Sequence, residues 1–195
     1  VCVVHAGGAV LAQPACSART PSRRDARPRR PPTRQNVERG AVPAGVQADL
    51  EPVIRLLTEA LATGIVCVLR YRRHHFMAAG INFQSVAAEF LTHATEEQGH
   101  ADLIAARITQ LGGEPNFSPE GLTTRSHAEY VAGDSLLDMI REDLVAERIA
   151  IDSYGEMIRY LGDGDPTTRR MLEGILAMEE EHADDLSSLL QEYSD

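Results

Sequence analysis

The stretches ATEEQGHADL (residues 94–103) and EEEHADDL (residues 179–186) together decide the fold class. Each contains a Glu-x-x-His motif inside a block in which apolar residues recur every three to four positions, as on one face of an α-helix. Because residues three apart lie on the same side of a helix, each motif directs a carboxylate and an imidazole into one region. The two motifs therefore predict two helices that face each other across a polar site. The motif residues are Glu97 and His100 in the first stretch and Glu179 and His182 in the second.

The same helical spacing occurs in four long blocks of the sequence. The predicted helices cover residues 46–79, 82–111, 134–161 and the segment that begins at Pro166. Proline is favoured at the first position of a helix, and Asp165 before it is a good N-cap residue. No block competes as a β-strand, so we expect an all-α fold.

The connections between the blocks predict how the helices are arranged. Gly80 marks a tight turn within the first pair, and residues 162–165 (Gly-Asp-Gly-Asp) mark another within the last pair. Residues 112–133 form a long connection rich in Gly, Pro, Ser and Thr. Two antiparallel helical hairpins joined by one long crossover between helices 2 and 3 form a four-helix bundle of the ferritin type.

Charged and polar side chains occupy positions on the inward faces of these helices, where a core needs apolar ones. A carboxylate without a partner is costly in a bundle core, but several become tolerable when they share metal ions. A mixed set of oxygen and nitrogen ligands disfavours a structural zinc site. We expect each Glu-x-x-His pair to hold one of two ions and a Glu from each other helix to bridge them. The candidate metal ligands are Glu97, His100, Glu147, Glu179 and His182.

The two motifs must be weighed against a simpler interpretation. A single Glu-x-x-His on an acidic helix usually belongs to a solvated face, whereas two copies in phase with the apolar stripe are much more specific. The neighbouring Glu96, Glu180 and Glu181 are out of phase, and we expect them to be exposed surface charges.

These residues resemble the ferritin-like superfamily, specifically bacterioferritin and the Dps-like proteins (DNA protection during starvation). The resemblance covers residues 46–192 and is carried by residues 95–102, 146–148 and 179–184. It implies a ferroxidase with a di-iron centre, which oxidises Fe(II) with O2 or H2O2 and serves iron storage or detoxification in a hollow oligomer. It also implies that Tyr71 lies beside the centre, although a half-buried core tyrosine would fit this position equally well.

The chain departs from the family pattern at three points. The first-helix Glu of the family falls at Gly64, and Glu59 lies about 140° away round the helix, so one metal position loses a carboxylate. His93, one turn before Glu97, could serve as a ligand or as a core residue beside the site. Gln98 replaces the haem-ligating Met of bacterioferritin, so no haem is expected. The short fifth helix of 24-subunit ferritins is missing, which favours a homo-oligomer such as a dimer or a dodecamer.

The charge is divided unequally along the chain. Residues 1–45 hold eight Arg against two acids, the remainder holds eleven Arg against 27 acids, and the formal net charge is −10. An acidic domain disfavours a nucleic-acid surface and suits a protein that attracts cations. We expect residues 1–45 to be a disordered Arg/Pro-rich extension and residues 46–195 to be the bundle.

The cysteines and the hydropathy indicate the cellular compartment in which the protein is expected. Cys2, Cys16 and Cys67 form neither a disulfide framework nor a zinc pattern, which indicates a reducing, cytoplasmic environment. Cys67 lies in an apolar helical block, where we expect a buried structural thiol. We expect no apolar run to approach the roughly 18–20 residues of a membrane span, so no membrane partner is expected.

Other functions stay open from the sequence. The Arg-rich residues 1–45 could bind DNA phosphates, as in a Dps-like protein. Gly64 would suit a degenerate subunit that assembles without turnover. An oxidase acting on an organic substrate or peroxide is weaker, because no rubredoxin-type Cys-x-x-Cys electron donor is present.

Overall fold

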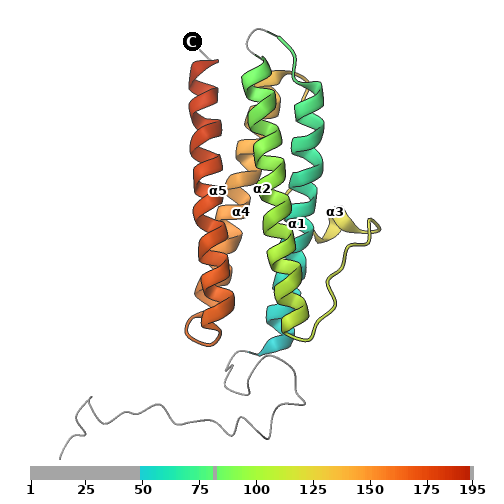
Figure 1. Ribbon diagram of the computed structural model, residues 1–195, viewed down its shortest axis with the longest axis vertical. Coiled ribbons are helices and arrows are strands. Elements are labelled where there is room, and N and C mark those ends of the chain that lie inside the picture. Colours follow the sequence, from blue (N-terminus) through green and yellow to red (C-terminus); the bar gives the residue numbers. More distant parts are fainter. Residues whose placement is uncertain (1–48, 81–82, 194–195) are drawn as a thin grey trace, which may run out of the picture. The chain divides into compact units, whose positions relative to one another are not determined.

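Four long helices form an antiparallel bundle in the computed structural model, which describes residues 49–80 and 83–193 (Figure 1). No strand occurs in these two ranges, and the predicted all-α bundle is confirmed. The predicted helix ends agree to within four residues. The predicted extension over residues 1–45, with Cys2 and Cys16, lies outside the described residues. The elements are α1 (Leu50–Met77), α2 (Phe83–Gln110), α3 (Leu122–Arg125), α4 (Leu136–Leu161) and α5 (Pro166–Glu192).

The helices pack as two hairpins, α1 with α2 and α4 with α5. Contacts of α1 with α4 and of α2 with α5 close the bundle. Between the hairpins, the chain crosses over beside α1 and forms the short α3 against it (Figure 1). The sequence did not predict α3, because four residues are too few for a helical period to be recognised.

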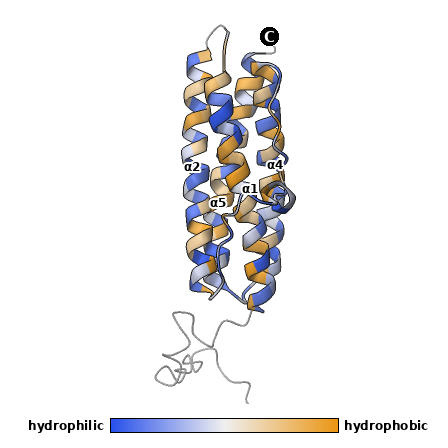
Figure 2. Ribbon diagram, turned by 90° about the vertical axis from the view of Figure 1, so that its right-hand side faces the viewer, coloured by the Kyte–Doolittle hydropathy of each residue, from blue (hydrophilic) through white to orange (hydrophobic). Residues whose placement is uncertain are grey.

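Most of the apolar core lies in two parts along the bundle, and a smaller third cluster packs α1 against α3. One part holds Leu57 and Ile104, and the other holds Tyr71 and Phe90. Hydrophobic residues recur along all four long helices, interleaved with hydrophilic ones, as amphipathic helices require (Figure 2). Along every long helix, a short stretch of sequence separates the residues of one core part from those of the other. The candidate site lies at this stretch.

The start of α5 is fixed by buried polar contacts. Asp165 caps the helix, because its Oδ1 accepts from the Thr168 backbone N–H at 3.0 Å. The Arg107 guanidinium of α2 donates to both oxygens of Asp165 at 3.0 Å and to the Thr168 hydroxyl at 2.7 Å. The predicted N-cap is confirmed, and it also ties α5 to α2.

A second buried network holds the crossover against α1. Asp143 of α4 accepts from Arg70 Nε at 2.8 Å, and its other oxygen lies 2.7 Å from His74 Nδ1. Arg70 also donates to the Glu129 carbonyl at 2.9 Å, and His74 Nε2 lies 3.0 Å from the Ala132 carbonyl. Two side chains of α1 thus bind both α4 and the connection that leads into it.

Helix α1 is long and apolar enough to cross a membrane, judged by length and composition alone. The expectation that no segment approaches this length was therefore wrong. Of the apolar window in α1, 56% is buried inside the bundle. Its buried side chains, including Val53, Leu57 and Leu61, belong to the core, which is the environment expected of a bundle's central helix.

Candidate metal centre

All five predicted ligands meet in one buried polar layer between the two parts of the core. Each is at most 6% exposed. The layer is formed by α2, α4 and α5, and the inward phase of these residues follows from the helical period. The residues are Glu97 and His100 of α2, Glu147 of α4, and Glu179 and His182 of α5.

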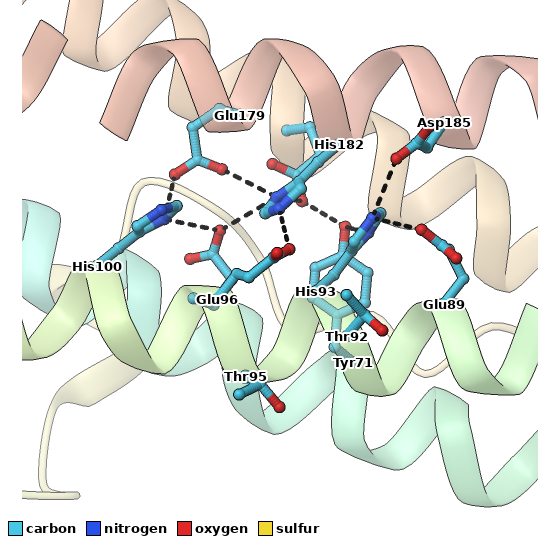
Figure 3. Close-up of polar contacts among 12 residues, drawn as sticks. Tyr71, Glu89, Thr92, His93, Thr95, Glu96, His100, Glu179, His182 and Asp185 are labelled. Carbon is cyan, nitrogen blue, oxygen red and sulfur yellow. Dashed lines mark hydrogen bonds and ion pairs between the residues drawn. The ribbon is translucent and has the colours of Figure 1, made fainter. Parts of the chain in front are cut away.

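One end of the layer is built around His100. Its Nδ1 lies 3.1 Å from Glu179 Oε1 (Figure 3) and 3.6 Å from Glu97 Oε1. Neither contact has the geometry of a hydrogen bond, and His100 Nδ1 and Glu179 Oε1 are buried without a hydrogen-bond partner. One imidazole nitrogen and two carboxylates therefore face one another at this end.

The other end is built around His182, whose Nδ1 faces three carboxylates. It lies 3.5 Å from Glu179 Oε2 and 3.8 Å from both Glu97 Oε1 and Glu147 Oε1. One ligand atom from each of these four residues can be chosen so that all lie within 4.8 Å of one another. This end therefore offers one nitrogen and three carboxylates.

The three carboxylates of the layer differ in how many histidines they approach. Glu97 and Glu179 each approach both histidines, whereas Glu147 approaches only His182. The two motif carboxylates are thus the ones placed between both histidines, and the bridging role expected of Glu147 stays a prediction. Helical periodicity gives the face on which a residue lies but not the axial offset between helices, so it could not separate these roles.

Gly64 of α1 is buried against the layer. A Cβ atom placed on Gly64 would lie 3.6 Å from Glu97 Oε2 and 3.8 Å from Ala101 Cβ, which are ordinary contact distances. Glu59, in contrast, points elsewhere and lies 3.3 Å from His127 Nε2. Position 64 therefore supplies no carboxylate to the layer, and the carboxylate of Glu59 does not face it.

Tyr71 and His93 adjoin the layer at the His182 end. The Tyr71 hydroxyl donates to Glu147 Oε1, and His93 Nδ1 lies 3.3 Å from the Tyr71 oxygen. The His93 ring stacks on His182, with centroids 4.1 Å apart and an interplanar angle of 24°. His93 thus lies beside the layer rather than among the four ligand atoms around His182 Nδ1.

Glu96 is not the exposed surface charge expected from the sequence. It is half-buried, and its Oε2 lies 2.8 Å from His182 Nε2 (Figure 3). A carboxylate at Nε2 fixes the proton on that nitrogen and leaves Nδ1 free to face the layer. Its phase on α2 lies about 100° from Glu97, and only the approach of α5 on that side brings it to His182.

The charges in the layer shift one another's protonation. Burial, followed by the charge of Glu179, raises the pKa of Glu97 well above its usual range. Burial also raises the pKa of Glu147 to about 7. For Glu179 burial acts in the same direction, but contacts with His100 and His182 outweigh it and lower the pKa of this carboxyl.

The two motif histidines are shifted towards their charged forms. Burial opposes their charge, but Glu147 and Glu179 raise the pKa of His182 to about 11. Glu179 and Glu97 similarly raise the pKa of His100 to about 9. Burial and the neighbouring His182 instead lower the pKa of His93 to about 3. A cation entering the layer must displace the protons of His100 and His182, so its binding depends on pH.

The chemistry of the layer fits divalent metal ions. Carboxylate and imidazole ligands suit first-row transition ions such as iron and manganese. The buried polar atoms without a hydrogen-bond partner include His100 Nδ1, both oxygens of Glu179 and His182 Nδ1. Unsatisfied buried atoms are costly, and shared metal ions would satisfy all four at once.

Comparison with known proteins places this arrangement in a family. Residues 54–195 match the ferritin-like domain. The chain belongs to the ferritin-like family. The family assignment agrees with the resemblance found in the sequence, and it supports an iron-binding function.

Relatives with two different names and one solved structure resemble the chain. It is 31% identical over 147 residues to the bacterioferritin of Mycobacterium avium, covering 75% of this chain and 87% of the relative. It is 32% identical over 142 residues to the nutrient stress-induced DNA-binding protein of Nostoc sp., covering 71% and 77%. Among solved structures, the bacterioferritin-related protein of Bacteroides fragilis, a dodecameric thioferritin, matches with a TM-score of 0.73 at 30% identity, over 76% of this chain and 89% of that one.

Proposed function

We propose that the protein binds Fe(II) in the buried layer and oxidises it as a ferroxidase that serves iron storage or detoxification. The observation that carries this proposal is the set of buried, unsatisfied ligand atoms of His100, Glu179 and His182, which face one another inside a ferritin-like bundle. Iron is the substrate, and the two ends of the layer are the positions at which it would bind.

The two ends are proposed to bind iron with different strengths. The His182 end has three carboxylates and one imidazole, while the His100 end has only Glu97 and Glu179 beside its imidazole. Gly64 occupies the position from which α1 would supply the missing carboxylate. We therefore expect one tightly bound iron per chain and a second, weaker one.

The residues of the layer favour oxidation through their charge. Carboxylates stabilise Fe(III) more than Fe(II), because the attraction grows with the charge of the ion. Two Fe(II) give one electron each to O2, which takes up two protons and leaves as H2O2, or to H2O2, which takes up two protons and leaves as two waters. Glu147, held by Tyr71, and His182, held by Glu96, keep their ligand atoms oriented into the layer.

The test compares native protein with Gly64→Glu, using Gly64→Ala as the matched control. We expect about one tight Fe(II) per chain in anaerobic titrations of the native protein and of Gly64→Ala, and two in Gly64→Glu. Aerobic oxidation of Fe(II) should be roughly tenfold faster in Gly64→Glu, because a direct carboxylate ligand should matter at least as much as an outer-shell partner, whose loss typically costs 10- to 100-fold.

Two outcomes would count against the proposal. If none of the three proteins bound iron, the metal-binding function would be excluded. If Gly64→Glu and native protein oxidised iron at equal rates, Gly64 would not be the missing ligand position, and the asymmetry between the two ends would be refuted.

We further propose that the protein is free of haem, forms a homo-oligomer and is cytoplasmic. Gln98 is exposed and donates to Asp102 at 2.9 Å, in place of a haem-ligating Met. The B. fragilis neighbour is dodecameric, and a mass twelve times that of the 21.3 kDa chain in light scattering would support the same assembly. DNA binding is not favoured as an alternative, because the described bundle is acidic and the Arg-rich segment lies outside it.

A further inference from the structure

His93 presents a second, separate set of ligand atoms on the side away from Tyr71. Its Nε2 lies 3.3 Å from Glu89 Oε1, on the same helix, and 3.8 Å from Asp185 Oδ2 of α5 (Figure 3). The imidazole is 1% exposed, while the two carboxylates are 38% and 56% exposed. A buried nitrogen therefore points at two carboxylates that reach solvent.

The hydrogen bonds of Tyr71 determine which nitrogen of His93 carries the proton. The single hydroxyl hydrogen of Tyr71 is donated to Glu147, so the Tyr71 oxygen can only accept from His93 Nδ1, 3.3 Å away. In the neutral imidazole, the proton then lies on Nδ1 and the lone pair on Nε2.

This tautomer leaves Nε2 without a suitable partner. The atom is fully buried and makes no hydrogen bond, and its lone pair faces two carboxylates that offer no hydrogen to it. Unsatisfied polar atoms are uncommon in folded proteins and call for a specific cause. A cation between the three side chains would satisfy all of them.

We propose that Glu89, His93 and Asp185 form a mononuclear site for a divalent first-row transition ion, separate from the central layer. Two atoms that each lie about 2.1 Å from one ion are roughly 3.0–3.6 Å apart at ligand angles of 90–120°. The distances from His93 Nε2 are 3.3 and 3.8 Å, so small side-chain adjustments of the exposed carboxylates suffice. Water would fill the remaining coordination positions.

The test uses crystals of the full chain soaked in Zn(II), with anomalous diffraction as the readout. The variants are the double substitution Glu89→Gln with Asp185→Asn, and Asp184→Asn as the matched control. Asp184 is an exposed neighbour of Asp185, so its substitution removes one negative charge from the same turn of α5 while leaving the three proposed ligands unchanged. The changed residues all lie outside the five ligands of the central layer.

We expect a peak beside His93 Nε2 in native protein and in Asp184→Asn, and at least a tenfold loss of its height in the double variant. A peak that persisted in the double variant would overturn the proposal, because the carboxylates would not be ligands. Peaks in the central layer without one at His93 would also overturn it while leaving the proposed function intact. Absence of every peak would overturn both.

Discussion

At the scale of single residues, the layer is supported by residues that lie just behind its ligands. Glu96 is the clearest case, because its carboxylate contacts the far nitrogen of His182 at 2.8 Å. Tyr71 likewise contacts Glu147, because its hydroxyl donates a hydrogen bond to that carboxylate. Partners of this kind orient a ligand, and their loss commonly lowers metal affinity 10- to 100-fold.

Substituting Glu96→Gln should therefore weaken the His182 end. The amide can still accept a hydrogen bond, but the charge that holds His182 in its orientation is lost. We expect roughly tenfold weaker binding of the first Zn(II) in calorimetric titration. Glu180→Gln, which removes an exposed charge beside Glu179, should bind as the native protein does. Equal affinities for both variants would show that Glu96 has no part in orienting His182.

The sequence predicted that the five candidate ligands face inward but not how they divide the layer. Their inward phase was sufficient to identify Glu97, His100, Glu147, Glu179 and His182. The missed features depend on neighbouring helices. Glu96 meets His182 only because α5 approaches on that side, and Asp143 is buried because Arg70 and His74 reach it from α1. Asp143 lies one turn before Glu147, so the same helical phase could have marked it as inward-facing.

At the scale of the elements, the start of α5 was predictable from two adjacent residues. The Asp165-Pro166 pair combines a good N-cap with a residue favoured at the first helical position, and α5 begins there. The sequence could not show that Asp165 also receives the Arg107 guanidinium of α2, because a contact between residues 58 positions apart has no local signal.

The substitution Asp165→Ala should strongly destabilise the bundle. It removes the cap of α5 and leaves the buried Arg107 guanidinium without its carboxylate, and we expect a loss of about 3 kcal/mol in the free energy of unfolding. Asp163→Ala is the control, because Asp163 is almost fully exposed in its ion pair with Arg169 and should cost less than about 0.5 kcal/mol. Urea denaturation would measure both values. Similar losses for the two variants would rule out a special role for the buried contact.

At the scale of the whole molecule, the layer couples stability to pH. The pKa values of His182 and His100 are raised to about 11 and 9, so their contribution to stability is complete below about pH 6.5. It is lost as the pH rises through 9 and 11. The raised pKa values of Glu97 and Glu147 act in the same direction. The lowered pKa of Glu179 acts oppositely, and its contribution is lost only in acid.

Protein stripped of metal with a chelator should therefore melt at a lower temperature at pH 10 than at pH 7. With roughly 2–4 °C for each kcal/mol in a domain of this size, we expect a fall of about 5–10 °C in calorimetry. Saturating Zn(II) should reduce this fall, because the bound ion replaces the protons that stabilise the carboxylates. An unchanged melting temperature between pH 7 and pH 10 would contradict the assigned protonation of the layer.

The arrangement of the bundle was predictable because loop lengths constrain it. Two short connections and one long one left few ways to pair four helices. The route of the crossover was not predictable, since it depends on Arg70 and His74 binding backbone carbonyls of residues 129 and 132. These contacts join two segments that are distant in sequence and carry no shared pattern.

All five residues of the polar layer come from a single chain. These five side chains are therefore brought together by folding alone, before any subunit meets another. Mass action links binding to subunit concentration only when association builds or alters the site. Newly folded chains at nanomolar levels should consequently capture ions with the same affinity as chains in a full assembly.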